Sequence, residues 1–201
     1  MIDTQVRQMI EKPLVLCARA FITVGIKADI VTMLGFIIGC LAGIAIWQGS
    51  FTTALCLILV SRFCDGLDGT IARQLGATDR GAFLDISLDF LFYSWIPLSF
   101  ALYDTQNALA ATFLIFSFVG TGTSFLSYAA IVEKRGIDPT VKANKGIYYL
   151  GGLTEGTETI MFLCACCIWP NSFVVLATLF CILCLVTTCL RIYRGYCDFK
   201  G

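Results

Sequence analysis

The sequence predicts an all-α integral membrane protein, with six transmembrane helices that follow an N-terminal amphipathic helix lying on the membrane surface. Three observations predict this fold. Hydrophobic residues make up 58% of the 201 residues, against roughly 45–50% in an average soluble domain. Apolar segments of about 20 residues, the length that spans a bilayer, follow one another along the chain. Lys and Arg gather in alternate connections between these segments.

The amphipathic helix is predicted at residues 2–21. Apolar side chains recur there at helical spacing, whereas Arg7, Lys12 and Arg19 fall on other faces. This pattern favours a helix at the membrane surface over a plain extension of the first span. The segment is too polar for a signal peptide.

Six apolar segments follow, each long enough to cross the hydrocarbon core. They cover residues 30–48, 51–73, 81–103, 108–132, 148–169 and 172–191. Several connections are short and rich in turn-forming residues, so neighbouring spans should form tight hairpins within a single domain, 1–201. In the first span, Gly35, Gly39 and Gly43 repeat every four residues, which predicts close packing against a neighbouring helix.

The distribution of charge predicts the topology. The first, third and fifth connections contain no Lys or Arg, so the positive-inside rule places both termini in the cytoplasm. The small size favours a bacterial inner membrane over a eukaryotic organelle. Lys plus Arg and Asp plus Glu both number 14, and without a basic excess a nucleic-acid-binding protein is excluded.

The cysteines do not indicate a metal or disulfide protein. Most of the 11 lie inside apolar segments, where Cys acts as a small core residue. No histidine accompanies them, and a zinc site is not expected.

Aspartates inside the spans mark the candidate functional site, because charge in a bilayer is costly and usually functional. Asp65 and Asp68 are three residues apart and Asp85 and Asp89 are four apart, so each pair shares one helix face. An antiparallel hairpin of the two spans would bring all four to a similar depth. Four carboxylates in a poorly solvated cavity need cations, and an all-oxygen set suits Mg²⁺, Mn²⁺ or Ca²⁺. Two divalent ions would balance them, an arrangement that clamps phosphate oxygens.

The residues after the first pair also suit a phosphate ligand. Gly66 and Gly69 remove side chains from the helix, which is useful where a ligand or another backbone comes near. Arg73 lies close to the face of Asp65, and its guanidinium could reach back to a phosphate. The alternative for Arg73 is an anchor at the membrane interface.

The two segments together closely resemble the signature of the CDP-alcohol phosphotransferase family, D-x2-D-G-x2-A-R-x8-G-x3-D-x3-D. The matching segments are DGLDGTIAR at 65–73 and GAFLDISLD at 81–89, which meet all eight literal positions. One departure is the connection 74–80, with seven residues where the pattern has eight.

The resemblance implies metal-dependent phospholipid synthesis, in which a substituted phosphate passes from a CDP-linked lipid such as CDP-diacylglycerol to a small polar alcohol, releasing CMP. It implies that Asp65, Asp68 and Asp85 bind Mg²⁺ or Mn²⁺, while Asp89 contributes to the second ion and acts as general base. It further implies a homodimer. By the same resemblance the CDP-lipid contacts are Gly69, Arg73 and Thr78, the last lying in the shortened connection.

The sequence does not decide which alcohol is the acceptor. Glu155 and Glu158 lie in a Gly- and Thr-rich stretch and would suit a polyol or amine, or would hold basic loop residues in place. Lys142, Lys145 and Arg191 would instead suit a phosphorylated acceptor such as glycerol 3-phosphate or inositol phosphate.

A carboxylate-lined bundle also fits a cation or proton-coupled transporter. Against it, the acids all lie toward the predicted cytoplasmic side and no inverted repeat is apparent. A purely structural subunit would have no reason to bury four aspartates together.

Overall fold

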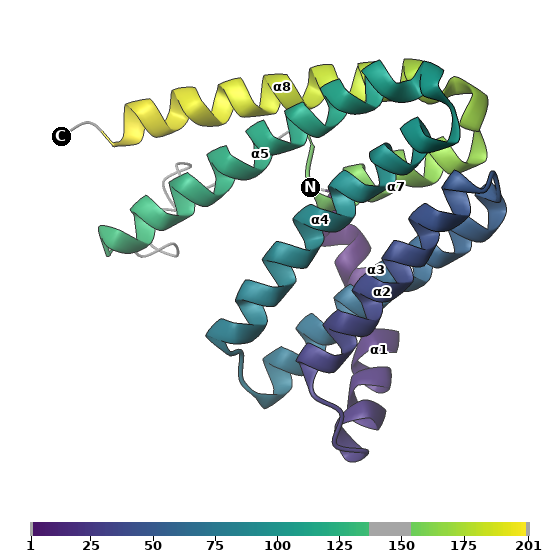
Figure 1. The fold of residues 1–201 in the computed structure, drawn as a ribbon. Coiled ribbons are helices and arrows are strands. Elements are labelled where there is room, and N and C mark those ends of the chain that lie inside the picture. The colour runs from purple at the N-terminus through teal and green to yellow at the C-terminus, as the bar shows by residue number, and fades with distance from the viewer. Residues whose placement is uncertain (1, 137–153, 200–201) are drawn as a thin grey trace.

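The computed structural model describes residues 2–136 and 154–199, with side chains from residue 11 onward, and these residues form helices without any strand (Figure 1). The long helices are α1 (Ile2–Thr23), α2 (Ala28–Trp47), α3 (Phe51–Leu75), α4 (Asp79–Tyr103), α5 (Ala108–Lys134), α7 (Gly156–Ile168) and α8 (Phe173–Asp198). Short 3-10 turns, Thr105–Asn107 and Pro170–Ser172, precede α5 and α8. The all-α prediction is confirmed.

Four helical stretches are long and apolar enough to cross a membrane: Ala28–Trp47, Asp79–Tyr103, Thr105–Lys134 and Pro170–Asp198. Helix α3 has 25 residues, but Arg62 and the motif aspartates make it more polar than these four. Helix α7 has 13 residues, and the start of the predicted span 148–169 lies outside the described residues. The protein is therefore an integral membrane protein, and its six spans stay a prediction.

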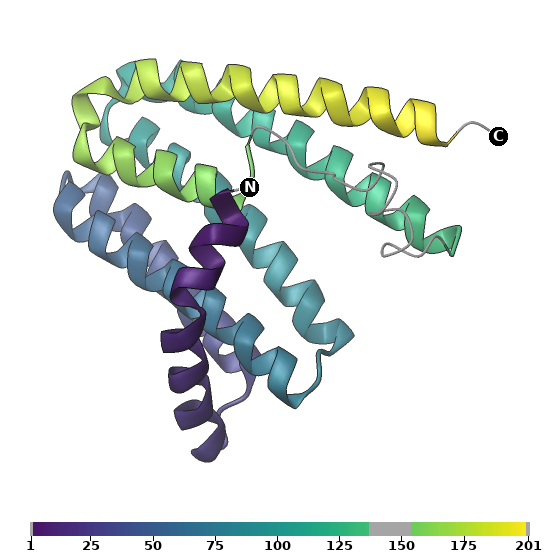
Figure 2. The same cartoon turned by 180° about the vertical axis from the view of Figure 1, so that it is seen from behind.

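Helices α2, α3, α4 and α5 begin and end within a few residues of the predicted spans, whereas α7 begins at Gly156 and α8 ends later than the span predicted there. That helix continues past Arg191 to Asp198. The helix is longer than the predicted span because hydropathy measures the apolar part only, whereas the polar last turns are held by tertiary contacts. Tyr128 of α5 donates a hydrogen bond to Asp198 Oδ2 at 2.8 Å. Helices α5 and α8 extend together away from the other helices (Figures 1 and 2).

The glycine stripe of α2 forms the packing surface that the sequence predicts. Gly35 lies against Cys64 of α3, and a Cβ added at Gly39 or Gly43 would overlap Phe92 or Trp95 of α4. Trp95 Nε1 also donates a hydrogen bond to the Cys40 carbonyl at 3.0 Å. Since small residues let backbones approach closely, α2 packs against both α3 and α4.

Two apolar clusters enclose the polar middle of α3. The larger cluster joins α2–α5, α7 and α8 around Phe92, Phe100 and Phe173. The smaller one joins α1, α2 and α3 and contains Leu14, Ala18, Val31, Leu67 and Ile71. Helix α1 thus buries one face against the bundle, while its Lys12 and Arg19 are exposed. Its position on the membrane surface stays a prediction.

Candidate active site

The candidate site lies where α2, α3 and α4 face one another. A small pocket there is lined by side chains of all three helices: Thr32, Gly35, Phe36, Ser61, Arg62, Asp65, Asp68, Asp85, Leu88 and Asp89. The sequence predicts a simple hairpin of the spans carrying the aspartates, but the structure shows that α2 also supplies one wall. The glycines of α2 allow α3 and α4 to pack close to it beside the pocket.

Three of the four predicted carboxylates form a compact group. One oxygen from each of Asp65, Asp85 and Asp89 lies within 4.8 Å of the other two. The Asp65 and Asp89 side chains are 34% and 29% exposed, so solvent still reaches the group. Negative oxygens at this spacing, with limited water, form a site that a cation stabilises.

The fourth carboxylate, Asp68, lines the same pocket without belonging to the compact group. Asp68 is only 4% exposed. Its Oδ2 atom is buried and has no hydrogen-bond partner among the described residues. A buried anionic oxygen without a partner is costly unless a cation reaches it. Together with the all-oxygen donor set, this orphaned atom fits a hard divalent cation.

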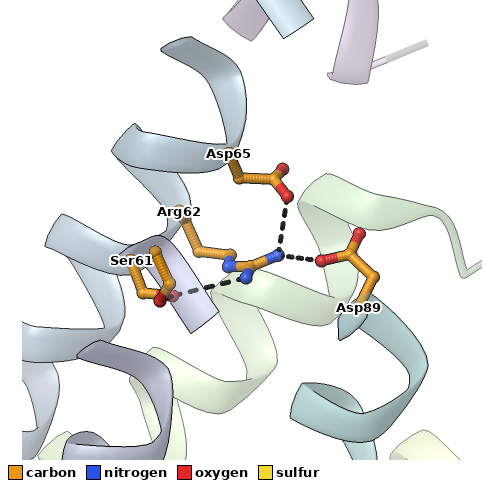
Figure 3. A network of polar contacts seen from close by, with 5 residues as sticks. Ser61, Arg62, Asp65 and Asp89 are labelled. Atoms are coloured by element: carbon orange, nitrogen blue, oxygen red, sulfur yellow. Dashed lines mark hydrogen bonds and ion pairs between the residues drawn. The ribbon is translucent and has the colours of Figure 1, made fainter. Parts of the chain in front are cut away.

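Arg62 is the functional residue that the sequence analysis missed. Figure 3 shows its guanidinium between Asp65 and Asp89, with Nη1 at 2.6 Å from Asp89 Oδ1 and 3.4 Å from Asp65 Oδ1. Its side chain is only 8% exposed, and its guanidinium carbon lies 4.1 Å from the centre of the Phe92 ring. The available signal was its position three residues before Asp65, which places both side chains on one helix face.

The residues predicted to contact the CDP moiety do not line this pocket. Gly69 leaves an open surface on α3 whose neighbour is Arg73: an added Cβ would lie 3.4 Å from Arg73 Nη1. Arg73 folds back along α3 and donates from Nη2 to Thr70 Oγ1 at 2.8 Å. Thr78 caps α4, where its Oγ1 accepts a hydrogen bond from the Gly81 amide at 3.1 Å. This helix cap is a structural role that the sequence analysis did not assign to Thr78.

Gly66 has a different neighbour from Gly69. A Cβ at Gly66 would lie 3.3 Å from Leu14 Cδ1, so the missing side chain makes room for α1. The sequence leaves open whether each glycine makes room for a ligand or for another helix. For Gly66, it is another helix that comes close.

Glu155 and Glu158, the acidic candidates for the acceptor pocket, lie at the N-terminus of α7. Glu155 and Glu158 form a reciprocal capping box, in which Glu158 Oε2 accepts a hydrogen bond from the Glu155 amide at 3.2 Å. Glu155 also attracts Arg191 of α8 electrostatically, and Arg191 Nη1 donates to the Thr121 carbonyl at 3.2 Å. Lys142 and Lys145 lie outside the described residues.

Comparison with known proteins identifies the family. The family model described as CDP-alcohol phosphatidyltransferase matches residues 26–190. The chain belongs to this family. It is 46% identical over 202 aligned residues to the inner membrane protein YnjF of Escherichia coli (strain K12), covering 100% of this chain and 98% of that one.

Solved structures of the phosphatidylinositol phosphate synthase of Mycobacterium tuberculosis share the fold. The structure with CDP-DAG bound superposes with a TM-score of 0.73 at 20% sequence identity, over 91% of this chain and 93% of that one. The same enzyme in complex with manganese and citrate gives a TM-score of 0.71 at 21% identity, over 91% of this chain and 88% of that one. The CDP-alcohol phosphatidyltransferase assignment makes the protein a transferase of phospholipid synthesis, and nothing in these comparisons supports the transporter alternative.

Proposed function

We propose that this CDP-alcohol phosphatidyltransferase uses Mg²⁺ or Mn²⁺ to move a phosphatidyl group from a CDP-linked lipid, such as CDP-diacylglycerol, to a small polar alcohol, with release of CMP. The observation that carries the proposal is the grouping of three aspartate oxygens within 4.8 Å beside the orphaned Oδ2 of Asp68. The donor is supported by the fold shared with an enzyme that was solved with CDP-DAG and with manganese.

In this proposal Asp65, Asp68, Asp85 and Asp89 hold two divalent ions. When bound, such ions supply positive charge that offsets the diphosphate and the departing CMP. Asp89 accepts the proton of the acceptor hydroxyl as that oxygen attacks phosphorus. Gly69 leaves room on α3 for the nucleotide, and Arg73 lies next to this surface, where it would contact the CDP moiety. Thr78, at the start of α4, would be a further contact.

For the acceptor, we infer an alcohol that already carries a phosphate, such as glycerol 3-phosphate or inositol phosphate. The acidic candidates Glu155 and Glu158 cap α7. This role argues against their binding an amine or polyol acceptor. Arg191 supplies a cation at this end of α8, and Lys142 and Lys145 are further candidates for the same phosphate. A guanidinium or ammonium group suits a phosphate better than a neutral hydroxyl.

We also propose a membrane topology. Six helices, α2, α3, α4, α5, α7 and α8, cross the membrane, with α1 lying at its surface. Both termini and the aspartate site face the cytoplasm, as the distribution of Lys and Arg predicts. The relative named an inner membrane protein supports a bacterial inner membrane. A homodimer is the expectation from the family.

The test is release of CMP from CDP-diacylglycerol by the purified protein in detergent. Glycerol 3-phosphate, inositol phosphate, inositol and serine are supplied one at a time, with Mg²⁺, with Mn²⁺ or with EDTA. We expect release with one phosphorylated acceptor and none in EDTA. Release with inositol or serine alone would refute the acceptor class, and release in EDTA would refute metal dependence. Asp85→Asn is the inactive control, and Asp104→Asn, at the opposite end of α4, is the matched active control.

A further inference from the structure

We propose that Arg62 is a positioning residue of the carboxylate site, whose fixed positive charge holds Asp89 and Asp65 in place and competes with divalent ions for their oxygens. The inference rests on the proposed function in that it treats these aspartates as metal ligands. It adds a residue outside the family signature, which begins at Asp65.

Arg62 is held in place by its neighbours. Its guanidinium lies over the Phe92 ring at 4.1 Å, and Nη2 donates to Ser61 Oγ at 3.3 Å. Ser61 is itself fixed, because its hydroxyl donates to the Gly35 carbonyl of α2 at 2.8 Å. The side chain therefore has an aromatic face on one side and a hydrogen-bonded anchor on another, both buried in the bundle.

The guanidinium of Arg62 contacts two of the aspartates. Nη1 donates to Asp89 Oδ1 at 2.6 Å, the length of a charge-assisted hydrogen bond, and lies at 3.4 Å from Asp65 Oδ1. One oxygen of Asp89 is thus occupied by Arg62. The other oxygen is left to accept a proton or to bind a cation. The guanidinium therefore determines the orientation of the Asp89 carboxylate in the site.

The positive charge of Arg62 acts on the whole carboxylate group. At 8% exposure Arg62 is poorly screened by water, so its charge acts strongly on cations bound a few ångströms away. It offsets part of the negative charge of the aspartates and repels a divalent ion. Removal of this charge therefore has opposite effects on two properties, since metal should bind more tightly while Asp89 loses its orientation and turnover falls.

A merely structural arginine would behave differently. Its loss would loosen the pocket and weaken metal binding and turnover together. The sign of the change in metal affinity therefore separates a positioning role from a structural one.

The experiment measures Mn²⁺ binding by electron paramagnetic resonance and turnover for the wild type, Arg62→Met and Arg62→Lys. We expect Arg62→Met to bind Mn²⁺ at least about tenfold more tightly and to turn over at least about a hundredfold more slowly. Arg62→Lys keeps the charge, and its Mn²⁺ affinity should stay within about threefold of the wild type. Unchanged or weaker Mn²⁺ binding by Arg62→Met would overturn the proposal. If that variant does not fold, Arg62→Gln removes the charge while keeping a donor, and the same expectation applies.

The control is Arg80→Met. Arg80 is 75% exposed and pairs with Asp29, and neither residue lines the pocket, so its loss should leave Mn²⁺ binding unchanged. A second arm in EDTA needs no metal. There, Arg62→Met and Asp89→Asn should be coupled, so that the double variant melts within about 2 °C of the less stable single variant. Additive shifts would overturn the inference. Failure of the wild type to bind Mn²⁺, with this coupling intact, would refute the proposed metal dependence and leave the Arg62–Asp89 pairing standing.

Discussion

Asp68→Asn should have opposite effects on stability with and without metal. In EDTA the wild type keeps a carboxylate that is 4% exposed and whose Oδ2 has no hydrogen-bond partner among the described residues. An unsatisfied buried polar atom costs about 1–3 kcal/mol. Asparagine has nearly the same shape without the charge, and its amide can donate toward the other carboxylates lining the pocket. We therefore expect Asp68→Asn to stabilise the metal-free protein by about 1–2 kcal/mol.

With metal the order reverses. At a metal concentration of 100 times Kd, binding stabilises the wild type by about 2.7 kcal/mol. If loss of the Asp68 ligand weakens binding about a hundredfold, about 2.3 kcal/mol of that gain disappears. For a chain of this size each kcal/mol shifts Tm by roughly 2–4 °C. The variant should therefore melt roughly 2–8 °C above the wild type in EDTA, and in Mn²⁺ should gain only about 1–2 °C where the wild type gains about 5–11 °C.

The assay is thermal unfolding in detergent, followed by tryptophan fluorescence, with a Mn²⁺ titration. Asp104→Asn is the matched control, because Asp104 caps the turn at the far end of α4 by accepting a hydrogen bond from the Gln106 amide at 2.9 Å. It should be neutral in both conditions, since Asn is an equally good cap. A lower Tm of Asp68→Asn in EDTA, or an undiminished response to Mn²⁺, would refute the reasoning.

Three other perturbations test the packing, the chemistry and a helix cap. Gly43→Ala inserts a methyl group into the Trp95 indole and should lower the free energy of unfolding by about 1–3 kcal/mol, measured as a lower Tm. The control is Gly195→Ala, which meets only ordinary contacts at 3.5 Å or more and should be neutral or stabilising. Equal effects of the two substitutions would contradict the packing argument. Asp89→Asn should reduce CMP release by about 10²–10⁴-fold. Binding of CDP-diacylglycerol, measured by equilibrium filtration, should stay largely intact. An active variant would show that Asp89 is not the base. Glu155→Ala removes half of a capping box and should lower stability by about 0.5–2 kcal/mol without raising the acceptor KM. A raised KM with unchanged Tm would instead assign Glu155 to the acceptor pocket.

Much of the fold and site was predictable because it depends on local periodicity. Hydropathy located the long helices, since an apolar segment of about 20 residues has few alternatives in a membrane. The spacing of Asp65 and Asp68, and of Asp85 and Asp89, showed that each pair shares a helix face. Proximity of the two pairs then required only that the helices be antiparallel, and the structure brings Asp65, Asp85 and Asp89 within 4.8 Å.

Other features were not predictable because they depend on contacts between distant segments. The polar end of α8 is held by Tyr128, 70 residues before Asp198 in the chain, which a hydropathy window cannot register. Glu155 and Glu158 had the spacing of a capping box, but their polar stretch was assigned to the middle of a longer span, so this signal was overlooked.

The sequence by itself determined that the chain is a helical membrane protein with paired aspartates on two helices, because hydropathy and helical spacing are properties of single segments. Its motif also resembles the CDP-alcohol phosphotransferase signature. Only the tertiary structure decided which oxygens meet, that Asp68 keeps an orphaned atom, and that Arg62 lies against Asp89, 27 residues away. These features depend on how α3 is rotated against α2 and α4. That rotation is set by the packing of glycines against Ser61, Phe92 and Trp95, and contacts between helices are not encoded in the periodicity of any one of them.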